Sequence, residues 1–343
     1  MLRLSVVLAT YNRADTLRRT LEHLATQDLD PGQFEVIVID DGSPDRTAEA
    51  VNGFAGIAPY PLTFLQHPNR GPGYTQNRGI RAARAPVVLL MADDIWLAPG
   101  ALRAHLEAHE RNPASEVAVL GQVLQSPECN QSAFLRHWDP FGLKDFRGVG
   151  ELPFFMFWTC NISAKTEFLL RHGMFSENSG PGGHHTHHDT ELGYRLRQHG
   201  LRILYSEQAL GHHYHPATLK QTIRQYYERG LNWGSFRKLV PAPEVLILFH
   251  LLTLKTLREF VLALRTPDPL PPAERSLLRH VVRTILRSIA FNRLTVPGFW
   301  NPFLARVESS PQLERLLSRR TFRALMHYHF VRGIRDGEQR FGM

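Results

Sequence analysis

Two adjacent carboxylates, Asp93 and Asp94, follow the apolar residues 87–91 of this 343-residue sequence. Adjacent carboxylates at the end of a buried strand repel each other and lose hydration, and a divalent cation relieves both costs. Carboxylate oxygens suit Mg²⁺ or Mn²⁺, usually together with a phosphate group of a substrate. The pair therefore predicts a metal site, and the alternative is a solvated pair of acids at a strand end.

A second acidic pair, Asp40 and Asp41, ends the apolar residues 34–39. A carboxylate at such a position can accept hydrogen bonds from a nucleoside base or a ribose hydroxyl. The sequence has neither a Gly-x-Gly-x-x-Gly fingerprint after its first apolar segment nor a Gly-Lys-Ser/Thr phosphate loop, which disfavours a dehydrogenase and a P-loop enzyme. The alternative is a turn in which Gly42 and Ser43 lead into a helix.

Asp189 and Glu191 lie in the segment His-Asp-Thr-Glu at 188–191, which opens a predicted helix. A carboxylate near a helix N-terminus stays ionised and projects from a rigid element, which suits a general base. We therefore expect Asp189 to act as the base, with Glu191 in reserve. The alternative is that Asp189 only caps the helix.

Histidines gather on both sides of the predicted strand 202–205. Imidazoles at short spacing can bind Zn²⁺, but neither segment offers a cysteine or a His-x₃-His pair on a helix, so a zinc site is the weaker interpretation. The alternative is solvated loop residues that titrate near neutral pH. The histidines are His184, His185, His187 and His188 before the strand, and His212, His213 and His215 after it.

Apolar segments and segments of helical periodicity alternate four times near the N-terminus. This alternation predicts an α/β fold with a Rossmann-like, mostly parallel twisted sheet flanked by helices. Since such sheets bind ligands beyond the carboxyl ends of their strands, the acidic pairs are expected to line one cleft. The expected strands are 4–9, 36–39, 62–65 and 87–91, followed by 117–120 and 202–205.

Positive charge is concentrated in the last third of the chain. Lys and Arg number 40 against 32 Asp and Glu, a net charge of +8, and residues 241–343 hold 16 of the basic residues and 8 of the acidic ones. Prolines at 241 and 243 open this region, whose periodicity is helical. We predict one domain over 1–240, which holds the acidic motifs, and a basic helical region over 241–343 that binds an anionic partner.

Arg275, Arg279, Arg283 and Arg287 recur at every fourth position. With apolar residues on the opposite face, residues 275–289 predict a basic amphipathic helix of the kind that lies on an anionic membrane surface. The alternative is a helix that packs on the catalytic domain with its arginines solvated. The apolar residues are Leu278, Val281, Val282, Ile285 and Ile289.

The two cysteines, Cys129 and Cys160, form no Cys-x-x-Cys pair, which favours a reducing compartment. The first apolar segment is too short for a signal peptide, and no window offers about 18 uncharged apolar residues. We therefore expect a cytoplasmic protein, either free or peripheral to the inner face of the cell membrane.

The ordered set of motifs resembles glycosyltransferase family 2, which has the GT-A fold. The similarity covers roughly residues 3 to 240, and its specificity lies in the order of the motifs. The motifs are Leu-Ser-Val-Val-Leu-Ala-Thr-Tyr-Asn-Arg at 4–13, Val-Ile-Asp-Asp-Gly-Ser at 38–43, Asn-Arg-Gly-Pro-Gly at 69–73 with Asn-Arg-Gly at 77–79, and Met-Ala-Asp-Asp at 91–94.

The resemblance implies an inverting transfer of a sugar from a nucleotide diphosphate sugar, with Mn²⁺ or Mg²⁺ on the diphosphate. It also implies that an acidic residue at the start of the later helix, Asp189, is the catalytic base. The residues expected to bind the nucleotide are Thr10, Tyr11, Asn12, Arg13, Asp40, Asp41, Asn69, Gly71, Asn77 and Asp93. Those expected to bind the metal are Asp94, Asp93, His213 and His215.

This sequence departs from the family pattern at three positions. The first acid of the family's Asp-x-Asp metal motif falls on Met91 or Ala92, so Asp94 is the favoured direct ligand. Gln76 stands where the family often has an arginine, which removes a cation unless Arg78 or Arg81 replaces it. His188 replaces the first acid of the pair that supplies the base.

The implied function is a metal-dependent, inverting glycosyltransferase in cell-envelope or polysaccharide synthesis. Its acceptor would be a glycan, a lipid-linked molecule or a small molecule; nucleic acid is not an expected partner, and no oligomeric state is predicted. One alternative is a nucleotidyltransferase that makes a sugar nucleotide, but the sequence lacks the Gly-rich basic loop that this needs. Another is a non-catalytic protein that binds sugar nucleotides or a membrane surface, which the incomplete metal motif would suit.

Overall fold

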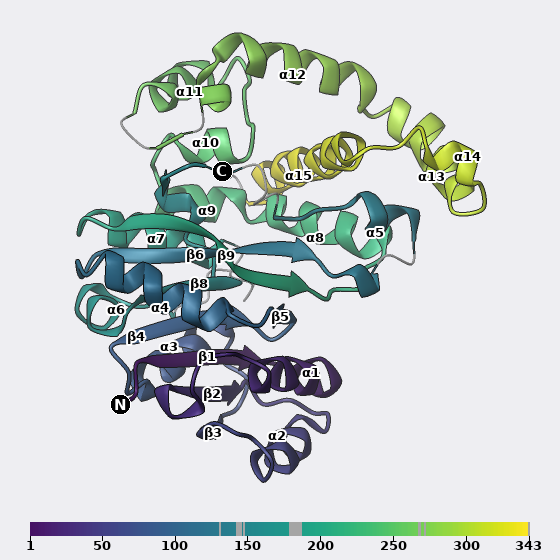
Figure 1. The fold of residues 1–343 in the computed structure, drawn as a ribbon. Coiled ribbons are helices and arrows are strands. Elements are labelled where there is room, and N and C mark those ends of the chain that lie inside the picture. The colour runs from purple at the N-terminus through teal and green to yellow at the C-terminus, as the bar shows by residue number, and fades with distance from the viewer. Residues whose placement is uncertain are drawn as a thin grey trace. The chain divides into compact units, whose positions relative to one another are not determined.

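A computed structural model describes residues 1–129, 132–141, 146, 148–177, 187–266, 269–270 and 272–341 (Figure 1). The chain divides into two compact units. The first comprises Met1–Leu124 and Phe141–Tyr214, and the second comprises Gln125–Pro140 and His215–Met343. Residue 240, where the sequence predicts a domain boundary, lies inside the second unit, and that boundary stays a prediction.

The first unit is built on a sheet whose first four strands are parallel, in the order β3-β2-β1-β4 (Figure 1). Strands β1, β2 and β4 are buried along almost their whole length, which explains why they are continuous apolar segments in the sequence. These strands, which the apolar segments predict, are β1 (Leu4–Thr10), β2 (Phe34–Asp40), β3 (Leu62–Gln66) and β4 (Val87–Ala92). The connecting helices are α1 (Ala14–Ala25), α2 (Thr47–Ala55) and α3 (Pro72–Ala82).

The rest of the sheet is antiparallel, so the sheet is mixed. Strand β8 pairs with both β4 and β6, while β9 pairs with β5 and β7. The α/β class with flanking helices is confirmed, although the sequence does not predict β5, β7 or β8. The strands are β5 (Ile95–Leu97), β6 (Val117–Gln125), β7 (Glu151–Leu152), β8 (Asn161–Lys165) and β9 (Arg202–His213).

Helix α7 (His188–Arg197) packs against the short 3₁₀ turn η4 (Phe154–Met156) through Gly193. A Cβ atom at Gly193 would lie 2.3 Å from the carbonyl oxygen of Phe154 and 2.9 Å from the Cβ of Phe157. Because only a hydrogen fits there, Gly193 fixes the approach of the helix that carries Asp189. The other helices of this unit are η1 (Pro31–Gln33), α4 (Ala101–Arg111) and α6 (Thr166–His172).

Two buried histidines of α4 lie against strand β8. His105 bonds through Nδ1 to the hydroxyl of Ser163 and through Nε2 to the side-chain oxygen of Asn161, and His109 Nε2 also contacts the Ser163 hydroxyl. Burial lowers the pKa of His105 to about 4, and burial with the nearby charge of Lys165 lowers the pKa of His109 to about 3. Both imidazoles are therefore neutral parts of the core.

The second unit is helical, which confirms the predicted helical C-terminal region. Glycines let helices α8 (Leu219–Leu231) and α15 (Arg319–Phe341) pack closely. A Cβ atom at Gly230 would lie 2.1 Å from the Phe330 carbonyl oxygen, and one at Gly333 would lie 2.2 Å from the Tyr227 carbonyl oxygen. The elements are η2 (Pro127–Cys129), α5 (Ala133–His137), α8 (Leu219–Leu231), α9 (Trp233–Leu239), α10 (Val245–Leu248), α11 (Leu257–Leu264), η5 (Pro272–Arg275), α12 (Leu277–Ala290), η6 (Val296–Trp300), α13 (Asn301–Val307), α14 (Pro311–Glu314) and α15 (Arg319–Phe341). Within the described part of the chain, no helix has both the length and the apolar character needed to cross a bilayer.

The close packing at Gly193 predicts a stability difference between two glycine substitutions. Gly193→Ala should lower the free energy of unfolding by about 1–3 kcal/mol, because the added methyl group meets backbone atoms of η4. Gly53→Ala, in helix α2 with open space around it, should raise it by about 0.5–1 kcal/mol. Urea unfolding of both variants measures this, and equal effects would show that α7 does not depend on Gly193.

The buried histidines predict a loss of stability between about pH 6.5 and pH 4. Over this range the unfolded chain binds protons at His105 and His109 while the folded chain does not, so stability falls as the pH falls. His105 alone should account for roughly 3 kcal/mol. Urea unfolding at several pH values tests this, and His105→Gln should show a shallower slope; an unchanged slope would contradict the assignment.

Candidate active site

Arg13 joins the two adjacent carboxylates at the end of β4. Its Nη1 lies 3.0 Å from Oδ1 of Asp93 and 2.6 Å from Oδ2 of Asp94, and both acids are only 5% exposed. Thr10, the last residue of β1, donates its hydroxyl to Asp93 Oδ2 at 2.7 Å, and Thr20 of α1 donates its hydroxyl to the Asp93 carbonyl oxygen at 2.6 Å. The pair is thus a buried, organised cluster, which excludes the solvated alternative.

Two carboxylates share one guanidinium in this cluster. Burial raises the pKa of Asp93, Arg13 opposes this, and the neighbouring charge of Asp94 raises it further. Burial acts to lower the pKa of Arg13, but the charges of Asp94 and Asp93 outweigh burial and raise it. The cluster therefore has room for a further positive charge.

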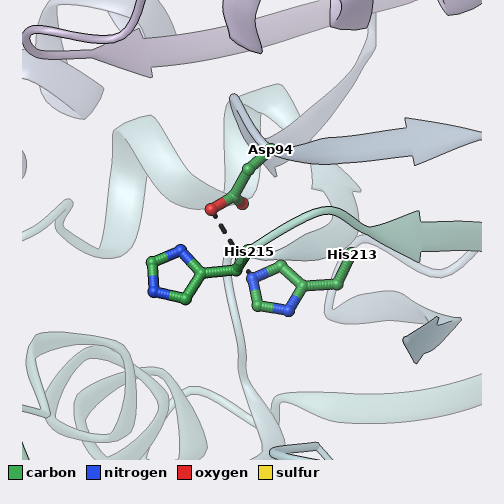
Figure 2. A group of neighbouring side chains, drawn as sticks. All are labelled: Asp94, His213 and His215. Atoms are coloured by element: carbon green, nitrogen blue, oxygen red, sulfur yellow. Dashed lines mark ion pairs between the residues drawn. The ribbon is translucent and has the colours of Figure 1, made fainter. Parts of the chain in front are cut away.

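Asp94 faces two histidines from the distant end of β9 (Figure 2). Antiparallel pairing sets Ile95 of β5 opposite His213, and the Tyr214 amide donates to the Asp94 carbonyl oxygen at 2.8 Å, so the segment from His213 to His215 is held beside Asp94. The Asp94 Oδ2 and His213 Nε2 atoms are 3.5 Å apart, and ligand atoms of Asp94, His213 and His215 all lie within 4.8 Å of one another. One carboxylate and two imidazoles in this arrangement fit a divalent metal ion.

A second group with metal-binding side chains, His250, Glu274 and His280, lies in the second unit. Arg283 occupies it, with Nη1 3.1 Å from His250 Nδ1 and 3.3 Å from Glu274 Oε2. Arg13 also contacts Asp94 of the first group, at 2.6 Å, so an arginine contact does not separate the two groups. The group around Asp94 is favoured by its position just beyond the end of a parallel strand, where such sheets bind ligands.

Thr159 and His188 each hold the carboxylate of Asp189 in place. Its Oδ1 accepts a hydrogen bond from the Thr159 hydroxyl at 3.0 Å, its Oδ2 accepts one from the Thr159 amide at 3.3 Å, and His188 Nε2 lies 2.8 Å from Oδ1. Burial acts to raise the pKa of Asp189, but His188 and Thr159 outweigh burial and lower it. The carboxylate is therefore ionised near neutral pH.

The helix-capping alternative for Asp189 does not match this geometry. The N-cap of α7 is His187, which has a positive φ of 73° and no capping hydrogen bond from its side chain. Asp189 lies in the first turn, and its carboxylate accepts a hydrogen bond from the backbone amide of Thr159, outside the helix. Glu191 is bound to Arg195, with 2.5 Å from Nε to Oε1, and is 8% exposed. It is therefore poorly placed as a reserve base.

Asp94 and Asp189 meet around the segment that contains Thr159 and Cys160. Burial raises the pKa of the Cys160 thiol, and the charges of Asp189 and Asp94 raise it further, so both carboxylates act on this one group. The Cys160 carbonyl oxygen accepts from the Ala92 amide at 3.3 Å, next to the Asp93–Asp94 pair. Residues that are 95 positions apart in the sequence thus face the same part of the first unit.

Asp40 and Asp41 bind the protein's own loops. Asp40 is fully buried and accepts bonds from the Ser43 amide at 3.0 Å and from the Gln66 side-chain amide at 2.9 Å. Asp41 accepts from the backbone amides of Arg70 at 2.7 Å and Gly71 at 3.0 Å. These carboxylates shape the loops at the ends of β2 and β3, and Asp40 has no exposed surface to offer a ligand.

An open groove of about 460 Å³ lies at this edge of the sheet. Tyr11, which is 48% exposed, and Asn12, whose amide donates to the Ser43 hydroxyl at 2.7 Å, follow β1 beside it. Asn69 is exposed on the loop after β3. The groove is lined by Gly42, Ser43, Gln66, His67 and Pro68.

Asn77 is a structural residue of α3. Its amide nitrogen donates to the Phe175 carbonyl oxygen at 2.9 Å and to Glu177 at 2.8 Å, and its oxygen accepts from the Phe175 amide at 2.9 Å. Arg78 donates to the Gln66 carbonyl oxygen, and Arg81 pairs with Glu177. These bonds occupy Asn77 within the protein.

Sequence reasoning misses Thr159 and Thr20 as parts of this region, and it notes Gln76 only as a departure from the family pattern. Gln76 donates to the Thr159 hydroxyl at 3.3 Å, so the residue that departs from the family pattern still reaches the Asp189 network. Threonine and glutamine carry no sequence signal for such a role, because they occur at any polar position. His184 and His185 of the predicted histidine cluster lie outside the described residues.

Known proteins share this sequence pattern and this fold. Residues 5–169 match the family described as Glycosyl transferase family 2. Validoxylamine A glucosyltransferase of Streptomyces hygroscopicus subsp. limoneus is 31% identical over 233 residues, which cover 61% of this chain and 51% of that protein. Chondroitin synthase of Escherichia coli is 28% identical over 249 residues, covering 62% and 35%. The chain thus spans about half the length of the first of these relatives.

Two solved structures have the same fold. A mannosyltransferase from Pyrobaculum calidifontis, in complex with GDP-Man and Mn²⁺, aligns with a TM-score of 0.56 and 18% identity over 97% of this chain and 87% of its own. Residues 1–349 of S. aureus TarS align with a TM-score of 0.52 and 19% identity over 100% and 92%. Together with the ordered motifs at the strand ends, these similarities show that the chain belongs to glycosyltransferase family 2 and has its GT-A fold.

Proposed function

We propose that this protein is a metal-dependent, inverting glycosyltransferase that moves a sugar from a nucleotide diphosphate sugar to an acceptor hydroxyl. The observation that carries the proposal is that Asp94 and Asp189 both lie by one segment: Thr159 donates two hydrogen bonds to Asp189, and the carbonyl oxygen of Cys160, the next residue, accepts from the Ala92 amide beside the Asp93–Asp94 pair. One carboxylate belongs to a group that fits a metal, and the other is ionised and oriented as a base.

The groove beside Tyr11 and Asn12 is the proposed place for the nucleoside. Its walls are the loops that Asp40 and Asp41 hold, so these acids support the binding surface. The residues after β1 connect the groove with the carboxylate pair: Asn12 bonds Ser43 of the groove, and Arg13 bonds Asp93 and Asp94. A pyrophosphate that extends from the nucleoside would approach the proposed metal site along this path.

Asp94, His213 and His215 would hold the metal ion. Because two of these three donors are imidazole nitrogens, Mn²⁺ suits the group better than Mg²⁺, which prefers oxygen ligands. When bound, the ion would supply positive charge against the leaving diphosphate. Asp94 would be the main carboxylate ligand because it, and not Asp93, has ligand atoms near those of His213 and His215, and it would share its charge with Arg13.

Asp189 would take the proton of the acceptor hydroxyl. Its lowered pKa keeps the carboxylate ionised before the acceptor arrives, and its bonds to Thr159 and His188 fix its direction. Attack on the face of the anomeric carbon opposite the diphosphate inverts the configuration there. Thr159 and His188 are thus positioning residues for the base.

The acceptor is proposed from the chemistry of the relatives. Their names describe a glucosyltransferase for validoxylamine A and a synthase of chondroitin. A glycan, a lipid-linked glycan or a small molecule of this kind would fit the proposed base. A role in envelope or polysaccharide synthesis, and a cytoplasmic location suggested by the two buried free cysteines, belong to the same proposal.

The proposed base makes Asp189→Asn the direct test of the reaction. Transfer should fall by about 10²–10⁴-fold because the amide cannot accept the proton, whereas binding of nucleoside diphosphate should stay within about twofold. The matched control is Glu191→Gln, which removes the reserve candidate and should lower turnover by less than about tenfold. Product analysis should find a nucleoside diphosphate; release of pyrophosphate would instead indicate nucleotidyl transfer.

The proposed metal site predicts a nucleotide-dependent thermal shift. Mn²⁺ should increase the stabilisation that a matching nucleoside diphosphate gives, by about 2.7 kcal/mol at a hundredfold excess over the Kd. Asp94→Asn should lose the part of the shift that depends on Mn²⁺, and Asp28→Asn, at a partly exposed acid paired with Arg103, should keep it. A shift that does not depend on Mn²⁺ in the unmodified protein would contradict metal binding.

A further inference from the structure

The segment from residue 275 to residue 307 contains six arginines and no Asp or Glu. It also exposes an unusual amount of apolar surface. Eight of the large apolar side chains that are exposed in the described chain lie within residues 277–299. They are Leu277, Leu278, Val282, Ile285, Leu286, Ile289, Leu294 and Phe299.

The orientation of α12 is fixed by the polar residues on its inner side. His280 is buried and lies 2.8 Å through Nε2 from the Glu274 carbonyl oxygen, and Arg283 forms an ion pair with Glu274 at 3.2 Å. Arg283 Nη1 also contacts His250 Nδ1 at 3.1 Å. Part of the arginine face of α12 therefore turns toward the protein. This differs from the alternative in the sequence analysis, in which the arginines are solvated.

The opposite side of α12 is consequently apolar and open to solvent (Figure 1 marks α12). We call Leu278, Val282, Ile285, Leu286 and Ile289 the apolar face of α12. Exposure reaches 73% at Leu278 and 66% at Ile289. Positions spaced by three and four residues form one stripe on a helix, so these side chains make a continuous surface.

Aromatic residues continue this surface beyond the end of α12. Phe299 is 55% exposed and stacks on Phe303 with ring centroids 5.5 Å apart. Trp300 stacks on the buried Phe291 at 4.5 Å and donates its indole N–H to the Ala290 carbonyl oxygen at 2.7 Å. The stacked rings anchor the end of the surface to α12. Aromatic side chains of this kind suit the boundary between water and lipid.

Charge complementarity identifies the occupant of this surface. Arg275, Arg279 and Arg293 are exposed beside the apolar residues, and residues 275–307 include no Asp or Glu. An apolar stripe flanked by arginines matches a bilayer surface with anionic headgroups, where the stripe enters the acyl boundary and the arginines meet the phosphates. We propose that the apolar face of α12, with Leu294 and Phe299, binds an anionic membrane surface.

This binding goes beyond sugar transfer, because it depends on residues that have no part in the proposed reaction. It would hold the enzyme at the leaflet where a lipid-linked acceptor resides. The absence of a membrane-spanning helix among the described residues agrees with a peripheral attachment. A second copy of the chain is the competing occupant, but two such surfaces would bring their arginines together without acids to pair them.

Vesicle flotation of the full chain tests the proposal. The protein should float with vesicles of phosphatidylcholine and phosphatidylglycerol, float much less with phosphatidylcholine alone, and be released in part by high salt. The double variant Ile285→Asp/Ile289→Asp should reduce the bound fraction by about tenfold or more. Leu316→Asp, at an exposed leucine of the same unit outside this surface, is the matched control and should bind like the unmodified protein.

A second pair of variants isolates the charge contribution. Arg275→Gln/Arg279→Gln should weaken binding to anionic vesicles. Because Arg275 also donates to the Thr266 carbonyl oxygen at 3.2 Å, the melting temperature is measured on the same variant to separate a loss of charge from a loss of stability. Equal binding to neutral and anionic vesicles, or no binding to either, would overturn the proposal. So would a dimer in light scattering that Ile285→Asp/Ile289→Asp dissociates in the absence of lipid. Nucleoside diphosphate binding, measured on the same variants, separates these outcomes from a failure of the proposed transfer.

Discussion

Two adjacent buried carboxylates that share one arginine are the constraint on which the rest of the first unit depends. Asp93 and Asp94 are both almost fully buried, and Arg13 Nη1 contacts both of them. Burial of like charges at this distance is unfavourable unless positive charge balances it. Arg13 offsets part of this cost, and Asp94 also faces the imidazoles of His213 and His215.

The two halves of the sheet meet this constraint together. The parallel strands bring Thr10 and Arg13 to the carboxylates. The antiparallel pairing of β5 with β9 brings His213 next to Asp94. Thr159, at the start of the segment that leads into β8, then orients Asp189. A site made from separate parts of the sequence thus depends on contacts that form only when the whole sheet is assembled.

The sequence predicts the elements whose pattern is local. Apolar runs predict β1 to β4, but not β8, because Asn161 and Ser163 look like loop residues until His105 supplies their buried partners. The same limit applies to side-chain roles. Asp40 and Asn77, which the sequence predicts as nucleotide-binding residues, bond the protein's own loops in this structure, and these tertiary contacts are not visible in the sequence. For α12, periodicity predicts the helix and its two faces but not which face turns inward.

The most direct measurement is anomalous diffraction at the manganese edge from crystals grown with Mn²⁺ and a nucleoside diphosphate. The account predicts one strong peak within about 2.0–2.6 Å of an Asp94 carboxylate oxygen, with His213 or His215 as a further ligand and the diphosphate on its open side. A well-defined diphosphate without a manganese peak would contradict it. A peak at His250 and Glu274 instead of Asp94 would contradict it equally.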